Sequence, residues 1–423
     1  MIYPAEWVKR WEKLCMSFTF SMGFSALVLF VVLMIFTLGK SPLLRIDRAG
    51  AAFIGAMSII LSGVLSLPEA LAAIDYRTII ILFSMMLLVS NLKLSGFFEA
   101  VGDLLLRWGY NRQIFLGAVI FCSGVLSAIA INDIVCLLFT PIVLLLCRKI
   151  RCEPLPYLLG VAIASNIGSA ATLLGNPQNI LVGSLSGLSF FSYFAAAAVP
   201  AAFGMILTFG LLNWKYKRSL QGTWKKKMSL GGTIHGYLMT KSLIIFLLVF
   251  ICYLAGMELA VAAGLGAALS LLTRRVNPDK VYAGIDFNLL LMFCGLFVIV
   301  DGVEKSGLLQ YALEQFVFLK VESLGSFSLL TILLSNIVSN VPAVLLLRFF
   351  IPPEQPEIWW KCLALFSTIA GNLTITGSMA NLIAAEAAKR QGIRMGAAAY
   401  MQIGFPVTIL LAIFSYAWLS FLR

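Results

Sequence analysis

The chain has 423 residues, of which 61% are hydrophobic and 12% are charged. Soluble globular domains are about one quarter charged and about half apolar, so this composition excludes a soluble globular protein and predicts an all-α polytopic membrane protein. The net charge of +12 does not indicate nucleic-acid binding, because no stretch is long enough to form a basic soluble domain and Lys and Arg gather in cytoplasmic loops.

The N-terminal part begins with a polar and aromatic segment at 1–16, which we expect at the membrane interface. The apolar run behind it is interpreted as a spanning helix rather than a cleaved signal peptide, because no small-residue cleavage site follows it. Residues 97–109 predict an amphipathic helix that is too short to span. The expected spans of the first half are 17–39, 49–66, 78–92 and 189–213, with a broken span over 155–187.

A second apolar run, over 114–147, is interrupted in its middle by Asn132 and Asp133. The run is too long for one helix, and its polar residues fall where a single span would be deepest in the membrane. We therefore predict a re-entrant helical hairpin with its tip at Ile131, Asn132 and Asp133.

The stretch SNIGSAATLLGNPQNILVG at 165–183 is rich in Asn, Ser and Gly although it lies inside an apolar region. Backbone polar groups in lipid must be satisfied internally, so non-helical backbone is tolerated only where it lines a protein-enclosed cavity. The stretch predicts an unwound point in a membrane helix, with a binding site built on it. Asn176 is suited to cap a new half-helix, and Pro177 suits its first turn.

The second half of the sequence repeats the first. AAIDYRTIIILFSMMLLVSNLKLSGFF at 72–98 matches AGIDFNLLLMFCGLFVIVDGVEKSGLL at 283–309 at one constant offset. We interpret 17–213 and 242–423 as two repeats, each with five transmembrane spans (one of them broken) and one re-entrant hairpin. An odd number of crossings inverts the second copy relative to the first, as in many secondary transporters.

Residues 214–241 form a basic polar loop between the repeats. If this loop is cytoplasmic, nearly every other cluster of Lys and Arg also falls inside, as the positive-inside rule requires. The single histidine, His235, lies in this loop and is interpreted as solvated rather than catalytic. The eight cysteines show no paired metal spacing and fall mostly in apolar segments, so they are interpreted as packing residues rather than disulfides or metal ligands.

The chemistry is expected where the two hairpin tips and the two broken helices meet near the membrane midplane. Half-helices present unpaired carbonyls at their C-terminal ends, which coordinate Na⁺, and unpaired N–H groups at their N-terminal ends, which hold an anion without a buried Arg. The candidate substrate- and ion-binding residues are Ser127, Asn132, Asp133, Gly175, Asn176, Asn179, Ser335, Ser339, Asn340, Gly377, Ser378 and Asn381.

The spacing of Ser and Asn agrees between the two halves. Ser127 lies five residues before Asn132, and Ser335 lies five residues before Asn340. Hydroxyl, amide and backbone oxygens are hard ligands that suit an alkali cation. Hydrogen bonding between helices is the alternative role, but recurrence of the pattern at both polar breaks favours a site. Na⁺ is expected at two sets of residues: Ser127, Asn132 and Gly175, and Ser335, Asn340 and Gly377.

Asp133 is a carboxylate at membrane depth, where ionisable side chains are usually functional. It could carry a coupling proton, complete a cation site or cap the outgoing half-helix, and these alternatives stay open. Its repeat counterpart is Val341, so an ionisable function would belong to one half only. No nucleophile–base or metal constellation and no P-loop occurs in the sequence, so neither an enzyme nor an ATP-driven pump is expected, and no cofactor beyond Na⁺ or H⁺ as the coupling ion.

Four motifs resemble the ion transporter superfamily: SAIAINDIVCLLFTPIVLLL (127–146), SNIGSAATLLGNPQNILVG, SNVPAVLLL (339–347) and AGNLTITGSMANLIAAEAA (370–388). That superfamily includes divalent anion/sodium symporters, citrate transporters, arsenite-efflux pumps and sodium/proton antiporters of one fold, as well as bacterial permeases. The resemblance implies an elevator mechanism in a homodimer. It also implies a scaffold formed by 17–66 and 242–273 and a transport domain formed by the hairpins and broken helices.

The sequence thus predicts a multi-pass transporter of the cell (inner) membrane that moves a small anion, a carboxylate or an inorganic oxyanion, coupled to Na⁺ or H⁺. Arsenite-type efflux and sodium/proton antiport are the alternatives, and an intramembrane enzyme or a channel is less favoured. The expected partners are the anionic substrate, the lipid bilayer and a second copy of the chain, but no nucleic acid.

Overall fold

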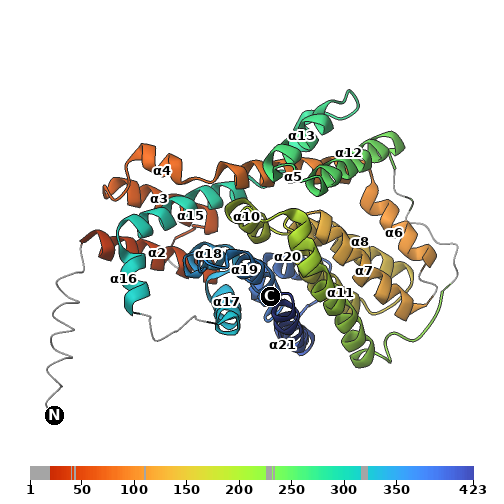
Figure 1. The fold of residues 1–423 in the computed structure, drawn as a ribbon. Coiled ribbons are helices and arrows are strands. Elements are labelled where there is room, and N and C mark those ends of the chain that lie inside the picture. The colour runs from red at the N-terminus through yellow and green to blue at the C-terminus, as the bar shows by residue number, and fades with distance from the viewer. Residues whose placement is uncertain are drawn as a thin grey trace, which may run out of the picture. The chain divides into compact units, whose positions relative to one another are not determined.

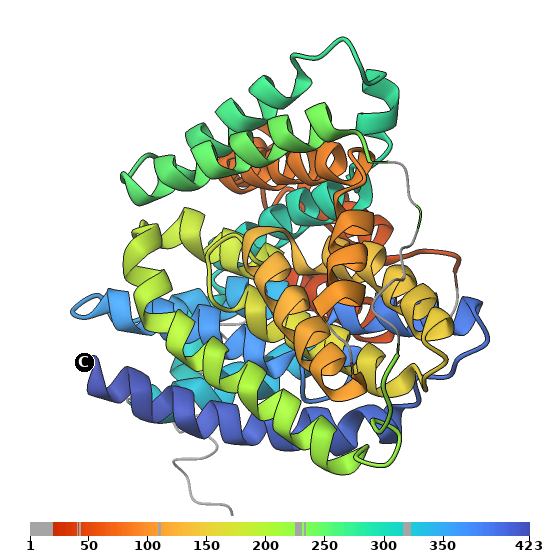
Figure 2. The same cartoon turned by 90° about the vertical axis from the view of Figure 1, so that its right-hand side faces the viewer.

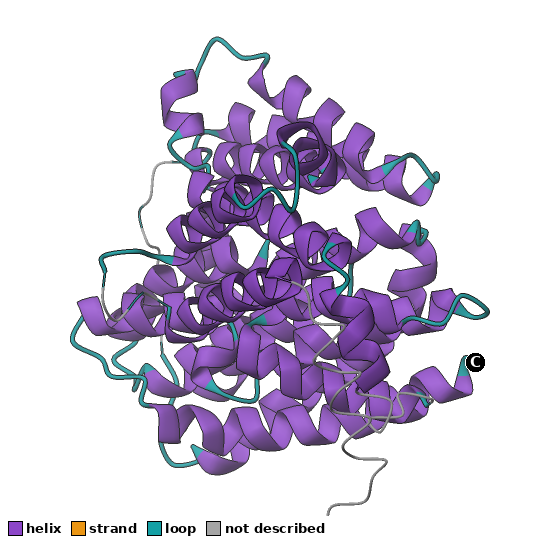
Figure 3. Ribbon diagram, turned by 90° about the vertical axis from the view of Figure 1, so that its left-hand side faces the viewer, coloured by secondary structure: helices purple, strands orange, loops and turns teal. Residues whose placement is uncertain are grey.

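The computed structural model describes residues 20–39, 41, 44–108, 111–224, 231, 234–315 and 323–423. These residues form helices joined by loops, and none of them belongs to a β-strand (Figures 1 and 3). The prediction of an all-α fold is confirmed. The expected interfacial segment at 1–16 and the lysines at 225–227 lie outside the described residues.

Seven helices of the described part are long and apolar enough to cross a membrane. They are α2 (Phe20–Leu38), α5 (Tyr76–Leu94), α7 (Arg112–Ile129), α11 (Phe190–Lys215), α12 (Gly236–Leu254), α15 (Phe287–Lys305) and α21 (Ala397–Phe421). Large apolar side chains such as Ile206 and Leu247 are exposed on these helices. Such a surface suits lipid, because lipid replaces the protein contacts that would bury these side chains in a soluble protein.

Shorter helices complete the chain. They are α3 (Arg48–Leu61), α4 (Leu67–Ala73), α6 (Phe97–Trp108), α8 (Asn132–Lys149), α9 (Leu155–Ser169), α10 (Pro177–Ser186), α13 (Leu259–Leu271), α14 (Pro278–Tyr282), α16 (Leu308–Gln315), α17 (Leu324–Val338), α18 (Asn340–Leu347), α19 (Pro356–Ala370) and α20 (Met379–Arg390), with 3₁₀ turns η2 (Arg348–Phe350) and η3 (Ile375–Gly377). Helix α3 covers most of the expected span 49–66, and α13 lies in the range 242–273 expected for the scaffold, but these helices have only 14 and 13 residues. A helix that crosses the hydrocarbon core needs about 20 residues.

The chain divides into two compact units, and the first comprises the residues up to Tyr76 together with Phe287–Lys320. Within it, α15 packs against α3, α2 and α4. Lys305, at the end of α15, forms an ion pair with Glu69 of α4. The hydrogen bonds that Glu69 accepts from Lys305 and Ser66 lower the pKa of its carboxyl group to about 2.

The second unit comprises Arg77–Asp286 and Val321–Arg423. Helix α9 packs along α7 and α8, α17 packs on α19, and α8 packs against α20. The long helices α11 and α21 lie side by side (Figure 2). Both interrupted segments and both predicted hairpins belong to this unit, so all twelve candidate site residues lie within it. The inverted orientation of the repeats and their division into scaffold and transport domain stay predictions.

Candidate substrate- and ion-binding site

The first predicted hairpin tip is a break between two helices. Helix α7 ends at Ile129, and α8 begins at Asn132. The backbone N–H of Asn132 donates to the carbonyl oxygen of Gly175 at 2.9 Å, and its side-chain Nδ2 donates to Oδ1 of Asn166 at 2.9 Å. The structure therefore brings Asn132 and Gly175 together, as the sequence predicts.

Asp133 lies in the first turn of α8 and is half-buried. Its backbone N–H donates to Oδ1 of Asn132 at 3.0 Å. A carboxylate in the first turn of a helix is stabilised by the unpaired N–H groups and the helix dipole there. This position is compatible with each of the three roles considered for Asp133.

The first broken helix is interrupted between Ser169, where α9 ends, and Pro177, where α10 begins. Asn176 caps α10, because its side chain accepts a hydrogen bond from the backbone N–H of Asn179 at 2.8 Å. Position 175 requires a glycine, because the backbone of Ser169 lies so close that a Cβ at this position would overlap its carbonyl oxygen. The expected cap and the expected unwound segment are both present.

In each broken helix, the side-chain amide of one asparagine donates hydrogen bonds to backbone carbonyl groups at the break. Nδ2 of Asn179 donates to the carbonyl oxygens of Thr172 at 2.9 Å and Ser169 at 3.3 Å. Nδ2 of Asn381 donates at the corresponding positions of the second half, and its acceptors are the carbonyl oxygens of Gly371 at 2.8 Å and Thr374 at 3.4 Å. Both amides thus bond to backbone carbonyl groups at the break, where a helix leaves carbonyls without α-helical partners.

The same two asparagines are held by residues of the opposite half. Oγ1 of Thr368 donates to Oδ1 of Asn179 at 3.0 Å, and Nδ2 of Asn166 donates to Oδ1 of Asn381 at 2.9 Å. Asn166 precedes Asn179 by the same number of residues as Thr368 precedes Asn381. The two contacts are therefore equivalent and cross from one half to the other.

A second equivalent pair of contacts accompanies the first. Nδ2 of Asn176 donates to Oγ1 of Thr368 at 3.0 Å, and Oγ of Ser378 donates to Oδ1 of Asn166 at 2.9 Å. We call these residues the crossed network: Asn132, Asn166, Asn176, Asn179, Thr368, Ser378 and Asn381. The network connects the first hairpin tip to both broken helices.

Asn166 is a member of the network that the sequence analysis did not single out. It is 2% exposed, and its Nδ2 donates to Oδ1 of Asn372 at 3.0 Å as well as to Asn381. Asn372 in turn accepts a hydrogen bond from the hydroxyl of Tyr400 at 3.1 Å. The available signal was an amide side chain inside an otherwise apolar helix, but the identity of its partners depends on tertiary packing.

The second predicted hairpin tip is a sharper break. Helix α17 ends at Val338, α18 begins at Asn340, and Ser339 between them has φ +78° and ψ 159°. This backbone region is favoured by glycine and costs other residues about 1–3 kcal/mol. Asn340 is buried, and its Nδ2 lies beside Gly371, where an added Cβ would be 3.5 Å from it.

Three predicted ligand atoms have no hydrogen-bond partner among the described residues. They are Oγ of Ser127, Oγ of Ser335 and Oδ1 of Asn340. All three residues are buried, and their exposed fractions are 0% for Ser127, 1% for Ser335 and 8% for Asn340. Buried polar atoms are normally paired, so these three oxygens fit the requirement for hard ligands of an alkali cation. Gly377, the third residue of the second set, lies against Asn336, whose Oδ1 would be 2.9 Å from an added Cβ.

The electrostatic character of this interior is neutral. The fully buried polar side chains of the described residues are Ser, Thr, Asn and Gln, together with tyrosines such as Tyr400, and none is Asp, Glu, Lys, Arg or His. Apart from the half-buried carboxylate of Asp133, the site can therefore act on a solute only through hydrogen bonds, helix ends and oriented dipoles.

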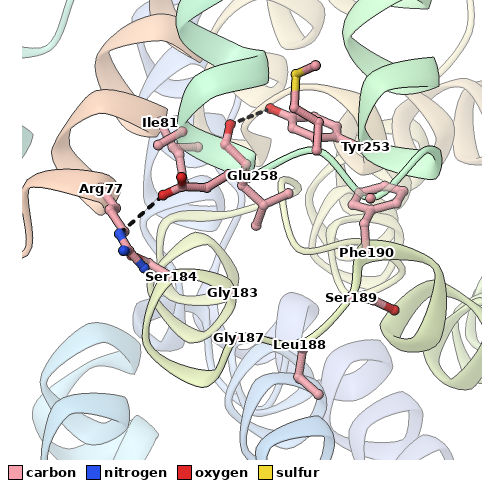
Figure 4. A pocket seen from close by; sticks show the side chains of 14 residues that line it. Arg77, Ile81, Gly183, Ser184, Gly187, Leu188, Ser189, Phe190, Tyr253 and Glu258 are labelled. Carbon is pink, nitrogen blue, oxygen red and sulfur yellow. Dashed lines mark hydrogen bonds and ion pairs between the residues drawn. The ribbon is translucent and has the colours of Figure 1, made fainter.

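A separate pocket of about 250 Å³ lies where α10 and α11 face α12 and α13 (Figure 4). An ion pair between Nε of Arg77 and Oε1 of Glu258, 3.2 Å apart, lies at its wall, and Phe190 and Tyr253 supply aromatic surface. None of the twelve candidate site residues lines this pocket. The pocket is thus not part of the crossed network.

Comparison with known proteins identifies the family. Residues 31–357 match the family model CitMHS, described as citrate transporter. The inner membrane protein YbiR of Escherichia coli is 32% identical over 322 residues, which cover 74% of this chain and 80% of YbiR. The silicon efflux transporter LSI3 of Oryza sativa is 28% identical over 440 residues, which cover 87% of this chain and 90% of LSI3.

A solved structure shares the fold. The crystal structure of the YdaH transporter of Alcanivorax borkumensis matches with a TM-score of 0.57 at 14% identity, over 95% of this chain and 97% of that one. Together with the apolar helices, these matches confirm the predictions of a multi-pass membrane transporter and of the ion transporter superfamily, and they point to transport rather than enzymatic activity. The chain belongs to the citrate transporter (CitMHS) family of membrane transporters.

Proposed function

We propose that this protein is a secondary active transporter that moves a small anion, a carboxylate or an inorganic oxyanion, together with Na⁺ or H⁺. The observation that carries the proposal is the neutral crossed network, together with three buried oxygens, those of Ser127, Ser335 and Asn340, that have no hydrogen-bond partner in the described part of the chain. Oxygen atoms of this kind suit a cation, and the adjacent helix N-termini suit an anion.

The neutral interior explains why a coupling ion is needed. An anion that enters a low-dielectric site without a charged partner loses several kcal/mol of hydration free energy. No buried Lys or Arg among the described residues compensates this loss. A Na⁺ or H⁺ that accompanies the anion neutralises its charge, so a coupled cation makes binding of the anion favourable.

The coupling cation is assigned to two places. Na⁺ would be held by Ser127, Asn132 and Gly175 in the first half and by Ser335, Asn340 and Gly377 in the second. If H⁺ is the coupling ion, Asp133 is the residue that carries it, because it is the carboxylate next to the crossed network in the first turn of α8.

We further propose that the site moves across the membrane in a homodimer by an elevator motion. Crossed hydrogen bonds between the two broken helices support this idea, because they hold both halves of the site in one rigid body. The scaffold of that motion would be 17–66 and 242–273.

A second function is efflux of a neutral oxyacid. LSI3 is named as a silicon efflux transporter, and silicic and arsenious acids are small, uncharged and rich in hydroxyl groups. A network of Ser, Thr and Asn side chains and backbone groups binds such a solute through hydrogen bonds without any compensating charge. In this case the solute moves without Na⁺.

Thermal unfolding of the purified protein tests both functions. A solute that binds the native state at 100 times its Kd stabilises it by about 2.7 kcal/mol. Citrate, sulfate, phosphate, arsenite and silicic acid are each added with and without Na⁺, at pH values on both sides of neutrality. Stabilisation by an anion that requires Na⁺ or low pH supports the coupled transporter. Ion-independent stabilisation by arsenite or silicic acid supports oxyacid efflux.

Variants connect the result to the site. Asn132→Ala and Asn340→Ala should lose the ligand-dependent shift and transport in proteoliposomes. Asn91→Ala is the matched control, because Asn91 is also buried but bonds to Leu87 and Ser270 outside the network. Full ligand shifts in both site variants would contradict the site assignment, and no shift with any of the solutes would contradict both functions.

A further inference from the structure

The C-terminal end of α8 brings two cysteines together. Arg151 has φ 51°, a left-handed conformation, and the backbone N–H of Cys152 donates to the carbonyl oxygen of Cys147 at 3.0 Å. The N–H of Arg151 also bonds to the carbonyl oxygen of Arg148 at 3.3 Å. These two bonds define a Schellman motif, in which the side chains at the positions of Cys147 and Cys152 contact each other.

The surroundings of the two thiols differ. Cys147 is buried, whereas Cys152 is partly exposed. A hydrogen bond from the Cys147 thiol lowers the pKa of Cys152, and the charge of Arg112 lowers it further, against an opposing effect of burial. The guanidinium of Arg112 is fixed beside this turn, because it donates to the carbonyl oxygen of Arg151 at 2.9 Å.

The other buried cysteines of the described residues are placed differently. The Sγ of Cys136 lies 3.0 Å from the hydroxyl of Ser165, and that of Cys362 lies 3.1 Å from the hydroxyl of Ser328. Each is thus a thiol paired with a serine inside a helix bundle. This arrangement agrees with their interpretation as packing residues, which does not account for the adjacent pair at the end of α8.

We propose that Cys147 and Cys152 are a redox-active dithiol that closes reversibly to a disulfide. The oxidant is a small disulfide such as oxidised glutathione. The Cys152 thiolate attacks one sulfur of glutathione disulfide, which forms a mixed disulfide and releases one glutathione thiolate. Cys147 then loses its proton and attacks the Cys152 sulfur, and the second glutathione leaves. The net reaction converts two protein thiols and one glutathione disulfide into one protein disulfide and two glutathione molecules.

The position of the pair gives the reaction a structural consequence. The disulfide fixes the last turn of α8 to the loop that leads into α9. Helix α8 begins with Asn132, and α9 carries Asn166, so both helices joined at this turn contribute to the crossed network. The neighbouring Arg148, Lys149 and Arg151 predict a cytoplasmic location, where protein disulfides are transient and redox-sensing.

Thiol trapping on the purified full chain tests this proposal. The protein is equilibrated with defined ratios of reduced to oxidised glutathione and quenched with acid, after which its free thiols are alkylated and its peptides are analysed by mass spectrometry. Alkylation of Cys147 and Cys152 should fall together as oxidised glutathione increases, a peptide with a 147–152 disulfide should appear, and dithiothreitol should reverse both changes.

Single variants separate the role of Cys152, which attacks the oxidant, from that of Cys147, which closes the disulfide. Cys147→Ser should stop at the mixed disulfide, with one glutathionyl group on Cys152, and Cys152→Ser should leave Cys147 free. Cys294→Ser, which removes a partly exposed thiol from α15, should behave as the wild type. The proposal is overturned if the wild-type chain keeps both thiols alkylated at every ratio. It is also overturned if the wild type accumulates as much mixed disulfide as Cys147→Ser. The wild-type titration decides the matter even if a variant fails to fold.

Discussion

The side chain of Asn166 makes four hydrogen bonds. Its Oδ1 accepts from Asn132 and Ser378, and its Nδ2 donates to Asn372 and Asn381. The equivalent residue of the second half is a threonine, which has a single hydroxyl. The first half therefore supplies the residue that joins the hairpin tip to both broken helices, so the two halves contribute unequally to one network.

Replacement of Asn166 should be costly. Asn166→Ala leaves the amide of Asn132 and the hydroxyl of Ser378 without their acceptor, and an unpaired buried polar group costs about 1–3 kcal/mol. We expect the free energy of unfolding, measured by denaturation in detergent, to fall by about 2 kcal/mol. Asn91→Ala removes one hydrogen bond between helices, so its free energy of unfolding should fall by less than half as much. Equal losses in the two variants would show that Asn166 is an ordinary helix-packing residue.

The two hairpin tips differ at the level of the element. The break before α8 uses extended residues with negative φ, whereas the break before α18 places Ser339 at φ +78°. Strain of this kind persists where the surrounding structure enforces it, and it is concentrated at functional sites. The second tip is thus held in its conformation by its neighbours rather than by its own sequence.

Glycine should release the strain at the second tip. Ser339→Gly is expected to raise the free energy of unfolding by about 1 kcal/mol, because glycine adopts this φ without steric cost. Ser339→Ala removes the same hydroxyl but keeps the Cβ, so it should bring no stabilisation. Denaturation of both variants in the same detergent measures the difference. If alanine stabilised the protein as much as glycine, the hydroxyl and not the backbone would be the source of the effect.

The sequence predicts elements of this fold better than their connections. The breaks at Asn132 and Asn176 were predictable, because polar residues inside an apolar run mark backbone that cannot remain helical in lipid. The short helix expected at 97–109 and the span expected at 189–213 match α6 and α11 closely. The strain at Ser339 and the crossed contacts were not predictable, because both depend on packing between segments that are remote in sequence.

At the scale of the whole molecule, no Asp, Glu, Lys, Arg or His among the described residues is fully buried. A carrier with one net charge gains or loses about 2.3 kcal/mol for each 100 mV of membrane potential. The low cost of moving a neutral complex through a neutral interior favours a cargo whose charges cancel. The function proposed above therefore predicts how the transport rate depends on membrane potential.

We expect transport to be nearly independent of membrane potential. In proteoliposomes loaded to impose about 100 mV, a net charge would change the driving force by about 2.3 kcal/mol. Initial uptake of silicic acid, or of an anion whose charge is cancelled by its coupled cations, should instead change by less than about twofold, which corresponds to about 0.4 kcal/mol. Asn132→Asp, which adds a carboxylate to the network, is the comparison variant and should become sensitive to potential. Strong sensitivity in the wild type would rule out a neutral complex.

The crossed contacts also constrain how the chain is made. Asn381, the partner of Asn166, lies 215 residues downstream, and Thr368, the partner of Asn179, lies 189 residues from it. When the first half leaves the ribosome, these two asparagines have no partner to bond across the halves. Lipid offers none, so these asparagines keep only their bonds within the first half until the residues around Thr368 and Asn381 have been synthesised. Assembly of the site is therefore a late event of biogenesis.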